Sequence, residues 1–106
     1  MRGVPFSDTI AEWRVSLTES AREDIAYFEA RDRRIIVAGI LSHLKVDAEV
    51  STRKRKQLRS NPVAPWELRI ERFRVFYSAD GDQIKVVAVG HKEHNELFIR
   101  GKKVEL

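Results

Sequence analysis

Apolar and polar residues alternate near the start of the chain. Trp13, Val15 and Leu17 lie on one side of the alternation, and Arg14 and Ser16 lie on the other. A period of two is the spacing of a strand that buries one of its faces. The pattern therefore predicts a half-buried strand over residues 13–17.

The period then changes to that of a helix. Ser20 and Glu23 have the spacing of a capping box, which predicts a helix start, and Ala21, Ile25 and Phe28 follow as one apolar stripe. The side expected to face water comprises Arg22, Glu23, Asp24 and Glu29. This segment is predicted to be a first amphipathic helix.

A second amphipathic helix is predicted from about Arg33 to Val50, with Asp32 as its N-cap. Its apolar stripe comprises Ile36, Ile40, Leu44 and Ala48, widened by Val37 and Leu41. Gly39 lies inside this helix, where it costs up to about 1 kcal/mol relative to alanine but permits close packing. The two helices are expected to form a helical hairpin.

Strand patterns return after residue 65. Trp66, Leu68 and Ile70 alternate with Glu67 and Arg69. Further strands are expected at Phe73–Tyr77 and Ile84–Val89, with a turn at Asp80–Gly81 and short end pieces at Leu97–Ile99 and Val104–Leu106. The order strand, two helices and three strands predicts an α+β fold, in which the two N-terminal helices pack on one face of a mainly antiparallel sheet.

Length and composition restrict the class of protein. The 106 residues are enough for one domain, expected over residues 13–106 after a lead-in at 1–12, and fractions of 42% hydrophobic and 34% charged residues are typical of globular proteins. The absence of cysteine excludes disulfides and thiolate metal sites. No apolar run reaches the roughly 18 residues of a membrane helix. We therefore expect a cytoplasmic protein.

Positive charge is concentrated in the second half. Seven Lys/Arg and nine Asp/Glu give residues 1–50 a net charge of −2, whereas 13 and seven give residues 51–106 a net charge of +6. Such segregation indicates a basic face for phosphates or for an acidic partner. Because the total is only +4, the charge on its own is also compatible with a purely solubilising role.

Two arginines are candidates for phosphate binding. Alternation places Arg69 opposite the apolar residues of its strand, and Arg74 opposite Phe73 and its apolar partners. Two guanidinium groups on one open sheet face can hold a phosphate and stabilise charge that develops during its transfer. Alternatively, they pair with Glu67 or Glu71 on a solvated face, which the spacing alone favours.

The segment Gly90–His94 offers groups for acid–base chemistry. His91 and His94 lie on either side of Lys92, so that an imidazole could transfer a proton beside a phosphate contact. Exposed histidines at a strand end are an equally good interpretation. His43 is the remaining histidine, and the local positive charge disfavours a metal ion. No cofactor or metal is expected.

The segment from Thr52 to Pro65 is a basic loop without acidic residues. Its cations are Arg53, Lys54, Arg55, Lys56 and Arg59. These residues could follow an RNA backbone, with Trp66 stacking on a base. The alternatives are a solvated charge run and a core tryptophan.

Taken together, these segments resemble the RelE/ParE toxin superfamily over roughly residues 13–98. The elements that carry the resemblance are Lys56-Gln57-Leu58, Trp66-Glu67-Leu68-Arg69, Arg74-Val75-Phe76-Tyr77 and Val89-Gly90-His91-Lys92. The resemblance implies a four- to five-stranded sheet with two N-terminal helices and an antitoxin protein as partner. For RelE-like members it implies metal-independent cleavage of messenger RNA on the ribosome; for ParE-like members it implies inhibition of DNA gyrase.

The resemblance assigns roles with two departures. Arg69, Arg74 and Lys92 fall on functional basic positions of RelE-like members. Glu67, however, stands where such members carry a catalytic lysine, and Phe98 stands where they carry a catalytic tyrosine, so that His91 or His94 would have to supply the missing group. The favoured hypothesis is an mRNA interferase, an endoribonuclease that acts on ribosome-bound messages. The alternatives are a ParE-like gyrase inhibitor and a degenerate, antitoxin-binding homologue.

Overall fold

The computed structural model describes residues 14–45 and 48–106. The expected lead-in at residues 1–12 and the side chain of Trp13 lie outside these ranges. The elements are β1 (Arg14–Leu17), α1 (Glu19–Ala26), α2 (Ala30–Leu44), β2 (Arg55–Gln57), β3 (Trp66–Ile70), β4 (Phe73–Asp80), β5 (Gln83–Glu93), β6 (Glu96–Ile99) and β7 (Lys102–Val104). The α+β class is confirmed.

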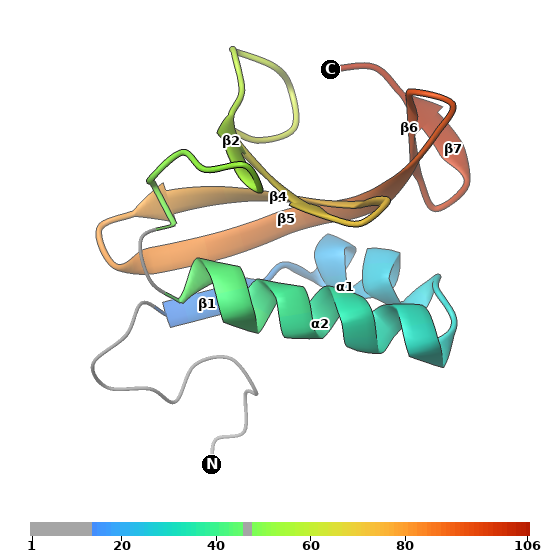
Figure 1. Cartoon of the computed structure of the whole chain (residues 1–106), viewed down its shortest axis with the longest axis horizontal. Coiled ribbons are helices and arrows are strands. Elements are labelled where there is room, and N and C mark those ends of the chain that lie inside the picture. Colours follow the sequence, from blue (N-terminus) through green and yellow to red (C-terminus); the bar gives the residue numbers. More distant parts are fainter. Residues whose placement is uncertain (1–13, 46–47) are drawn as a thin grey trace.

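The strands form one mixed sheet. Strands β2 to β7 follow one another in the order β2-β3-β4-β5-β6-β7, each antiparallel to its neighbour, and β1 pairs with β5 in parallel. Over residues 14–45 and 48–106 the sheet has seven strands, more than the four or five expected, because β2 lies within the basic loop and the C-terminal pieces form the β6–β7 hairpin. Figure 1 shows both helices on one side of this sheet.

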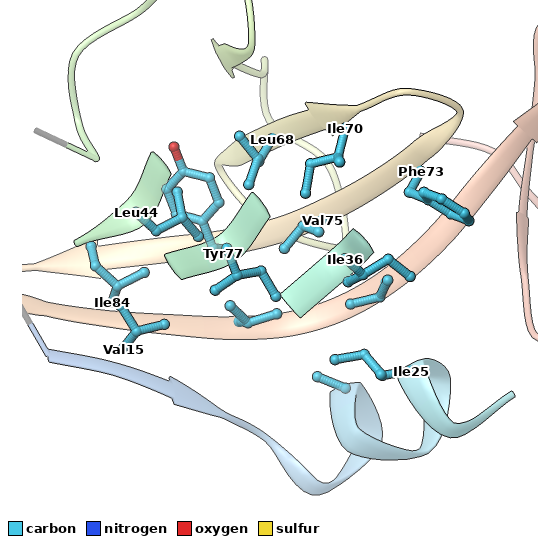
Figure 2. Packing of buried hydrophobic residues seen from close by; sticks show 14 of the residues in the cluster. Val15, Ile25, Ile36, Leu44, Leu68, Ile70, Phe73, Val75, Tyr77 and Ile84 are labelled. Carbon is cyan, nitrogen blue, oxygen red and sulfur yellow. The ribbon is translucent and has the colours of Figure 1, made fainter. Parts of the chain in front are cut away.

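The main core lies between the helices and the sheet. The alternation correctly predicted that Trp66, Leu68 and Ile70 are buried, and β4 contributes Phe73 and Val75 to the same face. The expected helix stripe of Ile36, Ile40, Leu44 and Ala48 is fully buried against these strands. Figure 2 shows Ile36 and Leu44 of α2 next to the strand side chains of this core.

The helix-free face carries a smaller apolar cluster. Its buried members are Ala64, Phe76, Ala88 and Leu97. The loop between β2 and β3 packs on this cluster and is fixed by Asn61, whose Oδ1 accepts from the backbone N–H of Val63 at 2.8 Å. The helix-free face therefore carries an apolar part as well as charged residues.

Both helix starts differ from the predictions. Thr18, rather than Ser20, is the N-cap of α1, and its Oγ1 accepts a hydrogen bond from Ala21 N at 3.0 Å. Helix α2 starts at Ala30, so that Asp32 lies in its first turn instead of capping it. Helix α2 ends at Leu44, well before Val50, although Ala48 beyond its end is still buried.

Asp24 is a further correction, because it was expected to face water and is only 1% exposed. Along one edge of β5, β1 pairs with residues 83–86 and β6 with residues 91–93, which leaves a gap in the backbone pairing. Asp24 Oδ2 accepts from Val89 N within this gap at 2.9 Å. Its Oδ1 lies 2.8 Å from Arg100 Nε.

Candidate nucleic-acid interface

Strand register brings three of the predicted basic residues to the helix-free face. Directly opposed residues of an antiparallel pair share a face. Arg69 opposes Arg74, and Arg74 opposes Gly90. Lys92 lies two residues beyond Gly90 and therefore points to the same side. The chain thus gathers Arg69, Arg74 and Lys92 from β3, β4 and β5.

Glu67 lies among these cations. It precedes Arg69 by two residues on β3 and shares its face. Its Oε1 accepts from Arg69 Nε at 3.1 Å, and its Oε2 lies 4.0 Å from Arg74 Nε. The Glu67 side chain is 5% exposed, whereas that of Arg69 is 42% exposed. The spacing favoured an ion pair between Arg69 and a glutamate on a solvated face. The ion pair with Glu67 is present, but its carboxylate is buried.

Arg74 is held more firmly than Arg69. Its Nη1 donates to the carbonyls of Glu71 at 2.8 Å and Phe73 at 2.9 Å. Burial lowers the pKa of Arg74. The positive charge of Arg69 lowers this pKa further, whereas the negative charge of Glu67 raises it. Glu71 has a positive φ of 55°, so Arg74 fastens a turn whose backbone conformation is uncommon for this residue type. Arg74 consequently supports the site, and Arg69 is its accessible guanidinium.

Two hollows adjoin the pair. A hollow of about 570 Å³ is lined by Arg53, Lys54, Arg69, Glu71 and Arg74. Lys54 is placed there because its carbonyl accepts from Arg69 N at 2.8 Å, which continues the β2–β3 pairing. A second hollow, of about 330 Å³, has Glu67 and Lys92 in its lining. Both hollows are open to solvent and bring cations from separate segments together.

The remaining cations of the basic loop divide into two groups. Lys56 opposes Glu67 across β2 and β3, and with Arg59 it lines a further hollow of about 710 Å³. Arg55 is instead directed towards the helix side, where it donates to His43 O at 2.8 Å and Val50 O at 3.0 Å. It serves the end of α2 rather than the open face.

The two candidate histidines are separated from the cation cluster. His91 opposes Phe73 and therefore lies on the helix side, stacked on Phe98 at 5.6 Å and edge-on to Phe28 at 5.9 Å. His94 lies in the two-residue turn between β5 and β6, with φ 51°. Neither the His91 imidazole nor the Phe98 ring shares the face of Lys92.

Sequence reasoning did not foresee that Glu67 would lie at the centre of the cluster. The available signal was its parity with Arg69, which placed the carboxylate and the guanidinium on one face. His43 was considered only as a metal ligand. Burial, with Lys54 and Arg55 nearby, lowers the pKa of His43.

Comparisons with known proteins support the fold. No family model matches the chain, and no curated protein matches it. A chain in the crystal structure of the toxin–antitoxin complex RelBE2 from Mycobacterium tuberculosis is similar, with a TM-score of 0.67 and 22% identity over 81% of this chain and 98% of that chain. The likeness shows that the two chains share a fold. Among the described residues, neither helix is long and apolar enough to cross a membrane.

Proposed function

We propose that this chain is the toxin of a type II toxin–antitoxin system and that it acts as an mRNA interferase in the cytoplasm. The observation that carries the proposal is the convergence of Arg69, Arg74 and Lys92 on the helix-free face of this fold. An antitoxin protein is the partner that the similarity to a toxin–antitoxin complex suggests. The substrate is a messenger RNA on the ribosome.

In this proposal each basic residue has a defined task. Arg69 and Lys92 contact the scissile phosphate, since both lie at the margins of solvent-open hollows. They stabilise the extra negative charge that forms when a ribose 2′-hydroxyl attacks the adjacent phosphate and the 5′-oxygen departs. Arg74 holds the turn beside them. The RNA backbone on either side of the scissile phosphate is contacted by further cations, namely Arg53, Lys54, Lys56 and Arg59.

Of the two histidines, His94 suits proton transfer better than His91. His94 is exposed, and the neighbouring Asn95 lines the hollow that contains Lys92. His91 is 9% exposed and is enclosed by aromatic rings on the helix side. A role for His91 in proton transfer would require the β5–β6 segment to rearrange.

The experiment is induction of the chain in a bacterium without its antitoxin, followed by the rate of protein synthesis within minutes. We expect prompt arrest, with messages cut at ribosome-positioned sites. Arg69→Ala and Lys92→Ala should each relieve the arrest at unchanged protein level, whereas Arg22→Ala, at an exposed cation on α1, should not. Translation that continues in cells producing the folded chain would contradict the proposal.

One observation favours a second candidate, a ParE-like inhibitor of DNA gyrase that cuts no RNA. His91 and Phe98 face away from the cations, and Glu67 partly neutralises them. With His91 and Phe98 on the other face, fewer groups that can transfer a proton lie beside the cations, which suits binding better than cleavage. Continued translation together with arrested DNA replication would support this candidate.

A further inference from the structure

Glu67 combines burial with access to a hollow. Its carboxylate uses one hydrogen bond to Arg69 Nε, and it lines the 330 Å³ hollow together with Lys92. Within residues 14–45 and 48–106, Oε2 accepts no hydrogen bond, because Arg74 Nε is 4.0 Å away. A carboxylate offers about four acceptor positions. Glu67 therefore has acceptor capacity left on the side of the cation cluster.

A carboxylate at this position opposes the binding of a phosphate. The carboxylate repels the negative charge of the phosphate. It also forms an ion pair with Arg69 and so competes with the phosphate for this guanidinium. A site selected only to hold anions would be stronger without it. Glu67 contributes to binding only if the ligand also brings a hydrogen-bond donor.

The nucleic-acid backbone has one such donor. Phosphate and ring oxygens only accept hydrogen bonds, whereas the ribose 2′-hydroxyl donates as well and distinguishes RNA from DNA. The 2′-hydroxyl is adjacent to the 3′-phosphate of the same nucleotide. A phosphate bound by Arg69 and Lys92 would therefore carry a 2′-hydroxyl within the same site as Glu67.

We propose that Glu67 is a specificity-determining residue that accepts a hydrogen bond from the ribose 2′-hydroxyl and so selects RNA over DNA. The inference rests on the proposed function, because it assigns the substrate class of the same site. RNA offsets the phosphate repulsion with a charge-assisted hydrogen bond. DNA meets the repulsion without that compensation, which is discrimination by a repulsive element.

The experiment measures the binding of matched single-stranded oligonucleotides to the full chain by fluorescence anisotropy. The probes are RNA, DNA of the same sequence, and the 2′-fluoro analogue, which keeps the RNA sugar conformation but lacks the donor. RNA integrity is checked on a denaturing gel. We expect the wild-type chain to bind RNA about tenfold more tightly than either analogue, the effect of one charge-assisted hydrogen bond.

Glu67→Leu should remove this preference by raising the affinity for DNA and for the 2′-fluoro analogue. Glu71→Gln is the matched control, because Glu71 lines the neighbouring hollow beside the same arginines. In that variant all three affinities should rise together and their ratios should stay constant. The wild-type comparison with the 2′-fluoro probe gives an answer even if Glu67→Leu fails to fold.

The outcomes separate this inference from the proposed function. Equal wild-type binding of RNA and the 2′-fluoro analogue, or a preference that survives in Glu67→Leu, would overturn the role of Glu67. If RNA is nevertheless cleaved in cells, the proposed function stands without it. If the chain binds none of the three oligonucleotides, the role of Glu67 is overturned, and the experiment in cells alone decides the proposed function.

Discussion

At the scale of single residues, Asp24 joins three distant parts of the chain through one carboxylate. It belongs to α1, accepts from Val89 N in β5 and pairs with Arg100 after β6. Burial raises its pKa, while the Val89 hydrogen bond and Arg100 oppose that shift. The contacts replace the backbone partner that β5 lacks between β1 and β6. Asp24 therefore supports the strand that carries Lys92.

Replacing Asp24 should destabilise the fold in a graded way. Asp24→Ala leaves a buried N–H without an acceptor and Arg100 without its buried partner, and we expect a loss of about 3 kcal/mol in the free energy of unfolding. Asp24→Asn keeps an acceptor for Val89 and should lose less. Urea unfolding at neutral pH measures both variants. Equal losses would contradict the role of the Val89 hydrogen bond.

A comparison of the wild-type chain with Asp24→Asn tests the titration of Asp24. Because its folded pKa lies above the ordinary value of 3.8, the folded state binds the proton more tightly than the unfolded state. The resulting stabilisation is complete below the unfolded pKa and is lost as pH rises through the folded pKa. The wild-type chain should therefore gain stability relative to Asp24→Asn as pH falls from neutral towards 3.8. A difference that is independent of pH would contradict the raised pKa.

The sequence correctly predicted the side of the sheet on which a residue lies where the alternation along its own strand was enough to decide it. Alternation along β3 and β4 correctly placed Arg69 and Arg74 on the face opposite the apolar residues. It could not reveal that Asp24 is buried, because both of its partners are more than sixty residues away in the chain. The side of His91 likewise depends on how far β5 continues and on its pairing with β6.

At the scale of elements, the contact between α2 and β3 depends on a missing side chain. A Cβ at Gly39 would lie 2.3 Å from Ile70 Cδ1. The close approach suggested by a glycine inside a helical pattern is therefore real. It sets the distance between α2 and the strand that carries Glu67 and Arg69.

Gly39→Ala should consequently destabilise the chain despite the better helix propensity of alanine. The clash typically costs about 1–3 kcal/mol, which exceeds or offsets a propensity gain of up to about 1 kcal/mol. Ile70→Val removes the nearest clashing atom, so the double variant should lose less stability than the sum of the two single variants. Thermal and urea unfolding of the four proteins measures this. Additive losses would show that the glycine is not required by Ile70.

Element boundaries were predicted less well than element types. The capping box at Ser20 and Glu23 has the required spacing, but Thr18 caps α1 because the helix begins at Glu19, directly after β1 ends at Leu17. Strand β2 was missed, since its residues are mostly charged and its pairing with β3 is a tertiary contact. Neither the N-cap of α1 nor the pairing of β2 with β3 can be read from a local pattern in the sequence.

At the scale of the whole molecule, the sheet separates two kinds of surface. The helix side encloses the main core, and the other side carries a small apolar cluster beside charged residues. Of the cations in residues 51–106, Arg69, Arg74 and Lys92 lie on the helix-free side, whereas Arg72 and Arg100 pair with acidic residues of the helices. Figure 1 shows the β2 segment and the C-terminal end on that side. The distribution of charge, rather than its total, should govern binding.

Salt dependence tests this distribution. Each phosphate neutralised on single-stranded RNA contributes about 0.7 to the slope of log affinity against log salt. Arg53→Ala combined with Lys54→Ala removes two cations from the 570 Å³ hollow and should lower the magnitude of the slope by about 1.4. Arg22→Ala combined with Arg34→Ala removes the same net charge from exposed helix positions and should leave the slope unchanged. Titrations with single-stranded RNA at several salt concentrations measure both. If the helix variant lowered the slope equally, net charge rather than the helix-free face would account for binding.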